Sequence, residues 1–219
     1  MSGKLRLAVF VSGGGTNLQS IIDSCHQESY PAEIAVVVSN KSKAYGLQRA
    51  EQAGIPTEIV AHKDFNSRQE HETEIIRRLE KHSVDLVVLA GYMRVVTDVL
   101  LKRFFNHARK LPGVINIHPA DTRAYQGAHG YEYAMGQLEQ HPERLAQTKI
   151  TVHFVDSGVD TGPIVRQVPV PIEAGDTLDD LRARGLKVEH QLYPEVIRLY
   201  AEGRLMLNDN VVTIIVGAV

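Results

Sequence analysis

The alternation of short apolar runs with amphipathic segments in the first half of the chain limits the possible folds most strongly. Residues 33–39 (EIAVVVS) are apolar along nearly their whole length, as expected for a strand in a sheet covered on both faces. Residues 17–26 instead place Leu18, Ile21 and Ile22 at helical spacing. By the same criteria we expect strands at 5–11, 33–39, 57–60 and 85–90, and helices at 17–26, 44–53, 67–82 and directly after Thr97. This order predicts an α/β protein with a doubly wound, mostly parallel sheet, right-handed crossovers and helices on both faces.

The second half of the chain continues this pattern with longer connections. We expect strands at 114–118, 149–155 and 164–170, a helix at 130–140 and a longer helix that begins at about Thr177. The connection 156–163 is dense in turn-forming residues. Pro194 is expected to bend or restart the long helix, because proline lacks the backbone N–H that a helix interior uses. The apolar tail at 211–216 is expected to form an edge strand or an interface.

Composition excludes several classes of function. With 24 Lys+Arg against 26 Asp+Glu, the net charge of −2 argues against a dedicated binder of nucleic acid or acidic membranes. The single cysteine, Cys25, excludes an internal disulfide framework and a multi-cysteine zinc site. His118, His129 and His153 show no recognisable metal-ligand spacing, so we expect no metal. No apolar run approaches the ~18 residues of a membrane span, and the N-terminal run is too short for a signal peptide. We expect one cytoplasmic domain over residues 1–219.

Three glycines lie between the first predicted strand and the first predicted helix. The segment 12–17 (SGGGTN) lets the backbone approach an anion closely at a helix N-terminus, where Thr16 or Asn17 caps the helix or donates to a phosphate. The alternative is an ordinary tight turn. A dinucleotide fingerprint is incomplete, because Leu18 replaces its third glycine and residues 39–41 (SNK) supply no acidic ribose ligand. The loop therefore favours a monophosphate over a dinucleotide.

A second group of polar residues lies near the ends of later strands. Asn116 and His118 are two apart in the strand 114–118, so their side chains share a face, and Pro119 places both at its carboxyl end. Asp160 lies in the turn between the last two expected strands. Each has a purely structural alternative, as a hydrogen-bonded strand end or a turn-forming aspartate.

In combination, these motifs resemble the folate-dependent formyltransferases. The matching motifs, in the family's order and spacing, are SGGGTNLQ at 12–19, GYMR at 91–94, NIHP at 116–119 and VDTGPI at 159–164. The resemblance spans roughly residues 5–205 and implies a Rossmann-like fold with 10-formyltetrahydrofolate as co-substrate and no metal. The branch that it resembles most formylates the amine of glycinamide ribonucleotide in purine biosynthesis. It also implies a phosphate-binding half at about 1–110 and a catalytic and formyl-folate half at about 111–219.

The resemblance assigns catalytic roles to three residues. Asn116 would donate a hydrogen bond to the carbonyl oxygen as it gathers negative charge. His118, as imidazolium, would stabilise the same charge and supply a proton to the leaving folate nitrogen. Asp160 would raise the pKa of His118 and help to relay the proton of the amine.

Binding roles also follow from the resemblance. Gly15, Thr16 and Asn17 match the loop that holds the ribonucleotide phosphate. Glu189 matches the position that holds the ribose, although from the helical pattern alone it would be a solvated residue. The residues implied in folate binding are Arg68, Met93, Arg94, Val95, Val96, Asp156, Ser157, Gly158 and Val159.

The loop after NIHP departs from the family pattern. Residues 120–127 (ADTRAYQG) replace an apolar Ser-Leu-Leu-Pro segment, and Gly127 is expected to keep the turn that follows it. The unexpectedly polar residues are Asp121, Thr122, Arg123 and Tyr125. This loop is either a surface segment that has drifted or a reshaped acceptor pocket, in which Arg123 or His129 contacts the substrate.

Three other activities are weighed against formyl transfer to this ribonucleotide. Transfer to a different amine and hydrolysis of 10-formyltetrahydrofolate both remain open, although the loop at 13–17 disfavours the hydrolase relatives, which lack it. A non-catalytic phosphate- or folate-binding module would require Asn116, His118 and Asp160 to be inert.

Overall fold

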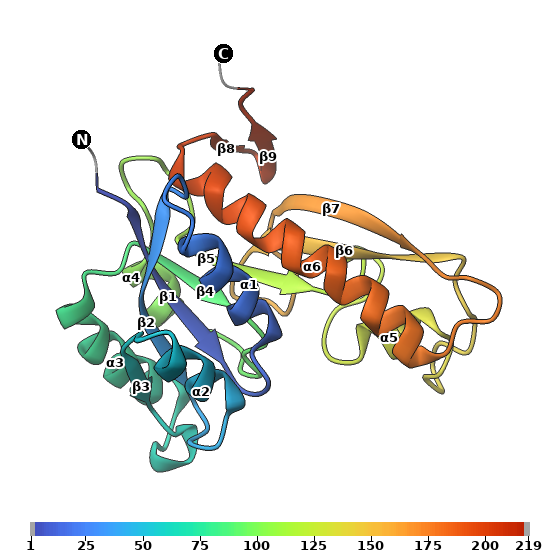
Figure 1. Ribbon diagram of the computed structural model, residues 1–219, viewed down its shortest axis with the longest axis horizontal. Helices are drawn as coiled ribbons and strands as arrows, with labels where there is room; N and C mark the ends of the chain where they lie inside the picture. Colours follow the sequence, from blue (N-terminus) through green and yellow to red (C-terminus); the bar gives the residue numbers. More distant parts are fainter. Residues whose placement is uncertain (1–2, 217–219) are drawn as a thin grey trace.

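A seven-stranded sheet forms the centre of the protein (Figure 1), whose computed structural model describes residues 3–216. In order across the sheet, the strands run β3-β2-β1-β4-β5-β6-β7. Their bounds are β1 (Leu5–Val11), β2 (Ala32–Ser39), β3 (Thr57–Ile59), β4 (Leu86–Leu89), β5 (Val114–His118), β6 (Gln147–Phe154) and β7 (Ile164–Pro171). Strands β1 to β5 are parallel, whereas β6 is antiparallel to both of its neighbours. The predicted mostly parallel, doubly wound sheet is confirmed.

Helices cover both faces of this sheet, as the apolar strand pattern requires. They are α1 (Thr16–Cys25), α2 (Tyr45–Gln52), α3 (Arg68–Leu79), α4 (Asp98–Arg103), α5 (Gly130–Ala134) and α6 (Leu178–Ala201), with short 3-10 helices at His62–Asp64 and Glu80–His82. Leu7 and Val9 of β1 pack in the core under α1, α2, α5 and α6, and Ala8 and Phe10 in the core under α3 and α4. Helix α6 runs beside α1 (Figure 1). No helix within residues 3–216 is both long and apolar enough to cross a membrane.

Three local expectations were only partly right. The helix expected at 130–140 ends at Ala134, because Gly136 adopts a left-handed conformation with φ of 67° and turns the chain. Pro194 does not divide α6, which is held by buried residues around it, and the Pro194 carbonyl accepts a hydrogen bond of 2.7 Å from Tyr30. The tail does not join the main sheet. Strand β9 (Val211–Ile214) pairs with β8 (Leu205–Asn208) in a separate hairpin, whose turn has two residues with positive φ.

Tyr193 fastens α6 to the strand ends that carry the polar residues, and its removal gives a first prediction. Its fully buried hydroxyl lies 2.9 Å from the Leu89 carbonyl and 3.1 Å from the Ile115 carbonyl. We expect Tyr193→Phe to lower the free energy of unfolding by about 1–3 kcal/mol, because both carbonyls lose a donor in the interior. Thermal denaturation measures this as a melting temperature lower by about 2–4 °C per kcal/mol. Tyr200→Phe is the matched control, since the buried Tyr200 hydroxyl has no hydrogen-bond partner among the described residues. An equal loss in both variants would contradict the role of Tyr193.

Candidate functional site

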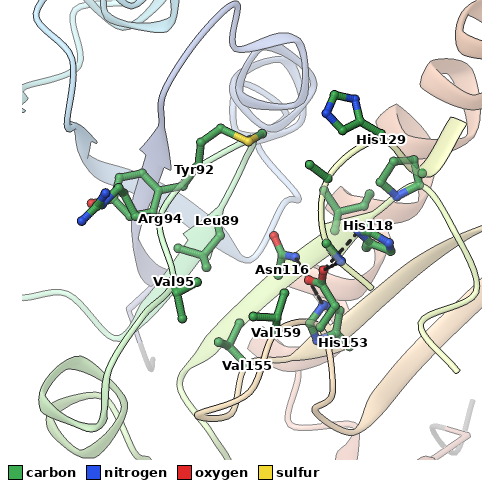
Figure 2. Close-up of a pocket in the computed structure, with 18 of the residues that line it drawn as sticks. Leu89, Tyr92, Arg94, Val95, Asn116, His118, His129, His153, Val155 and Val159 are labelled. Carbon is green, nitrogen blue, oxygen red and sulfur yellow. Dashed lines mark hydrogen bonds and ion pairs between the residues drawn. The ribbon is translucent and has the colours of Figure 1, made fainter. Parts of the chain in front are cut away.

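A cavity of about 740 Å³ opens at the carboxyl ends of β4 and β5 (Figure 2). Its size suits a small organic ligand, and strand ends are where open α/β sheets bind ligands. The predicted site residues that line it are Asn116, His118, Asp160, Met93, Arg94, Val95, Val96, Asp156, Gly158 and Val159. Within residues 3–216, no group of three or more His, Cys, Asp or Glu side chains is arranged to hold a metal ion.

The fold brings Asn116, His118 and Asp160 together on one wall of this cavity. The Asn116 amide nitrogen donates to one Asp160 carboxylate oxygen over 3.1 Å, and His118 Nδ1 lies 3.5 Å from the other. The Gly127 backbone N–H also donates to that second oxygen, over 2.9 Å. Gly127 has a φ of 92°, so the predicted turn is kept, and it positions the carboxylate of Asp160.

His153 is a fourth member of this group that the sequence did not reveal. Its Nε2 lies 3.4 Å from Asp160 and 3.3 Å from the Asn116 amide nitrogen, while its Nδ1 donates to the Phe154 carbonyl over 2.8 Å. Figure 2 shows Asn116, His118 and His153 converging on one point. The two acceptors facing the Asn116 amide nitrogen are so close together that one N–H serves both. The other N–H of Asn116 is therefore left for a ligand.

The buried imidazole of His118 has a lower pKa than the imidazolium expected from the sequence would need. Burial lowers its pKa below the ordinary value of 6.5, and this outweighs the nearby Asp160 charge, which raises it. Asp160 does raise the pKa of His118, as expected, but the expectation of an imidazolium omitted the depth at which the ring lies. The Nε2 atom of His118 has no hydrogen-bond partner among the described residues. At neutral pH His118 is thus a neutral imidazole with one free nitrogen.

Asp160 remains ionised although it is largely buried. Burial raises its pKa, but the contacts with His153 and His118 and the hydrogen bond from the Gly127 N–H together lower it below the usual value. The wall therefore holds a fixed negative charge next to a neutral base, an arrangement that stabilises an imidazolium once His118 takes a proton.

The glycine loop forms the start of α1, close to the ends of β1 and β2. Gly15 is the N-cap residue, with φ of 69°, and no side chain caps the helix, so the expectation that Thr16 or Asn17 caps it was wrong. The N–H groups of the first turn are left open to an anion. A Cβ atom at Gly15 would lie 2.8 Å from the Gly46 Cα, so this close approach and the left-handed backbone both require glycine.

Arg49, on α2, is a further residue of this loop that the sequence did not single out. Its Nε donates to the Gly14 carbonyl over 2.8 Å, and its Nη1 donates to Gln19 over 3.0 Å. The guanidinium lies over the Tyr45 ring, 5.0 Å from its centre. Arg49 therefore holds the loop from behind and adds a positive charge near the open N–H groups.

Glu189 lies beside the glycine loop, although it is far from it in the chain. It is only 6% exposed, so the alternative of a solvated helix residue is wrong. Its carboxylate accepts hydrogen bonds from the Asn17 amide over 2.6 Å and from the Tyr131 hydroxyl over 2.5 Å. The structure thus joins Asn17 and Glu189, the two ends of the expected ribonucleotide site.

The expected folate residues fall into two groups. Met93 is 68% exposed on the cavity wall, and its backbone N–H donates to the Ser12 hydroxyl over 2.9 Å, which ties this wall to the glycine loop. Asp156 holds the loop 156–160 through the Gly158 N–H. Arg68 and Ser157 are exposed and are not among the residues that line the cavity.

The two residues of the polar loop at 120–130 that were expected to contact an acceptor lie in different places. Arg123 does not line the cavity, and it donates to Asp121 over 3.2 Å and to Gln167 over 2.8 Å instead. His129 does line the cavity and stands at its rim, across from Arg94 (Figure 2). Of the two, only His129 faces the cavity.

An α/β sheet with a partly buried Asn–His–Asp group at its strand ends is the arrangement expected of a folate-dependent formyltransferase, and residues 5–197 match the family model described as Formyl transferase. The chain belongs to this family. It is 42% identical to the phosphoribosylglycinamide formyltransferase of Haemophilus influenzae, over 94% of this chain and 91% of that protein. It is 37% identical to the Escherichia coli protein of the same name, over 94% and 92%. The crystal structure of glycinamide ribonucleotide transformylase 1 from Symbiobacterium toebii matches with a TM-score of 0.89 and 41% identity, covering 98% of this chain and 96% of that one.

Proposed function

We propose that this chain transfers the formyl group of 10-formyltetrahydrofolate to the amine of glycinamide ribonucleotide, a step of purine biosynthesis. The observation that carries the proposal is the His118 imidazole on the wall of a ligand-sized cavity, with its Nδ1 3.5 Å from the Asp160 carboxylate and its Nε2 unpartnered among the described residues. The similarity to phosphoribosylglycinamide formyltransferases over nearly the whole chain supports the same acceptor. Both substrates are charged, water-soluble metabolites, so we propose the cytoplasm as the place of the reaction.

In the first step, the amine attacks the formyl carbon and a carbon–nitrogen bond forms. The formyl oxygen takes the electron pair of the carbonyl bond and becomes an oxyanion. Asn116 keeps one N–H free of its contacts with Asp160 and His153, and this N–H donates to the oxyanion.

In the second step, a proton moves from the attacking amine to the folate nitrogen. The neutral His118 accepts it at Nε2, and the imidazolium so formed is stabilised by Asp160. His118 then gives the proton to N10 of the folate as the bond between N10 and the formyl carbon breaks. The products are the formylated amine and tetrahydrofolate, and no charge or proton is left over.

The proposed binding residues lie around the catalytic group, along the carboxyl ends of the strands. The open N–H groups of residues 15–17 hold the phosphate, and Glu189 accepts from the ribose hydroxyls. The folate lies in the cavity against residues 93–96 and the loop 156–160. Arg68, at the exposed start of α3, is proposed to reach the carboxylate tail of the folate from outside the cavity.

A turnover experiment tests this function. We expect the purified protein to deformylate 10-formyltetrahydrofolate, followed by absorbance, only when glycinamide ribonucleotide is present. Equal turnover without the ribonucleotide would support the hydrolase instead. Turnover with another amine but not with this ribonucleotide would support a different acceptor, and no turnover in any mixture would overturn formyl transfer.

A further inference from the structure

Tyr131 is a buried residue of α5, directly after the loop at which the sequence departs from the family pattern. Its phenol lines the cavity, and its hydroxyl donates to a Glu189 carboxylate oxygen over 2.5 Å. We propose that Tyr131 is a positioning residue for the acceptor, which holds the Glu189 carboxylate in the orientation that binds the ribose. The inference rests on the proposed function, since it gives Glu189 that role.

The orientation of the buried Glu189 carboxylate depends on two hydrogen-bond donors. One oxygen of the buried carboxylate accepts from Asn17 over 2.6 Å and the other from Tyr131. Neither donor carries a charge, and a buried carboxylate is costly unless its oxygens are hydrogen-bonded. Burial and the neighbouring Glu189 hold the pKa of the Tyr131 phenol above its usual value, so the phenol stays a donor. Without the phenol, one Glu189 oxygen would lose its donor, and the carboxylate could rotate out of the orientation that binds the ribose.

The helix that carries Glu189 is shaped around this phenol. Gly185 lies one turn before Glu189 in the interior of α6, where glycine costs about 1 kcal/mol relative to alanine. A Cβ atom at Gly185 would stand only 2.1 Å from the Tyr131 hydroxyl oxygen. The glycine therefore makes room for the phenol to reach Glu189, and this is a second, independent sign that the contact is built into the fold.

The same loop also touches the catalytic group. Gly127 donates to Asp160 over 2.9 Å, and four residues later Tyr131 donates to Glu189. The segment between them joins the carboxylate that supports His118 to the carboxylate that we assign to the ribose. The atypical loop thus influences acceptor binding indirectly, through Tyr131 and Glu189, rather than by a contact of Arg123 with the acceptor.

The test is a kinetic comparison of Tyr131→Phe with the wild-type protein. We expect the KM for glycinamide ribonucleotide to rise about ten- to a hundredfold, as for loss of a hydrogen bond to a charged group. The kcat should stay within about twofold and the KM for 10-formyltetrahydrofolate should not change. Gly185→Ala, which displaces the phenol, should give the same split. Tyr133→Phe is the control, because the Tyr133 ring stacks on Tyr125 instead, at 4.3 Å.

A double variant tests whether Tyr131 acts through Glu189. If it does, adding Tyr131→Phe to Glu189→Gln raises the KM for the ribonucleotide no further than Glu189→Gln alone. Independent, multiplying effects would overturn the inference, as would an unchanged KM in Tyr131→Phe. A general folding defect would instead alter kcat and both KM values, and would count against it. Absence of ribonucleotide-dependent turnover in the wild-type protein would overturn the proposed function, a different outcome.

Discussion

Replacing His118 with alanine is expected to lower kcat by about 10²–10⁴-fold, the range typical of a positioned general acid–base group. The ring lies on the cavity wall with Nε2 unpartnered, so its removal takes away the only group in the proposed mechanism that moves a proton from the amine to the folate. The KM for the ribonucleotide should change little, because the glycine loop and Glu189 are left intact. Steady-state kinetics, with the ribonucleotide varied at a saturating concentration of 10-formyltetrahydrofolate, measures both quantities.

The control for this variant is His107→Ala. His107 is exposed, does not line the cavity and packs against Phe105, so its loss should leave kcat within about twofold of the wild-type value. A His118→Ala protein that turns over at the wild-type rate would refute the proton transfer assigned to it. A protein with weakened ribonucleotide binding but normal kcat would assign His118 to binding instead.

Much of the fold could be predicted because the strands are buried on both faces. Runs such as 5–11 and 33–39 are apolar enough to mark strands β1 and β2 to within one residue at each end. The direction of β6 could not be read in this way, since antiparallel and parallel partners bury similar side chains. Pro194 misled for a related reason: the packing of α6 against the sheet outweighs the local preference of one residue.

The site residues that lie on a single strand could be predicted. Those that are brought together by the pairing of two strands could not. Asn116 and His118 share a face of β5, which the period of two along a strand requires. His153 is paired directly opposite Asn116 across β5 and β6, and that register is set by contacts that a single sequence does not contain. The contact of Arg49 with the Gly14 carbonyl has the same origin, because it spans 35 residues.

The two halves implied by the resemblance meet at both sites. Asn17 of the first half donates to Glu189 of the second, and the cavity is lined by residues 91–96 from the first half and by His153, Val155 and Asp160, among others, from the second. The Met93 backbone is in turn held by Ser12, at the start of the glycine loop. We infer that phosphate binding and formyl transfer both take place at the carboxyl ends of the strands of one sheet, so neither half forms a complete site by itself.

Asp160→Asn is expected to lower kcat by about 10²-fold or more and to move the pH profile of the reaction. In the wild-type protein the rate should fall as the pH drops through the lowered pKa of His118, below 6.5, because a protonated Nε2 cannot accept the proton of the amine. The Asp160 charge raises the pKa of His118, so its removal lowers that pKa further. The acid limb should therefore shift to lower pH while the plateau drops.

The Asp160→Asn variant separates charge from shape. Asp160 has a φ of 53°, a left-handed conformation that asparagine also adopts readily, so the backbone of the turn should persist. Asp209→Asn makes the same change at an exposed turn residue with a φ of 46°, and it should alter neither the rate nor the pH profile. An acid limb that moves to higher pH in Asp160→Asn would contradict the proposed role, because it would mean that Asp160 does not favour the imidazolium. An acid limb that stays in place would show that the rate is governed by a group other than His118.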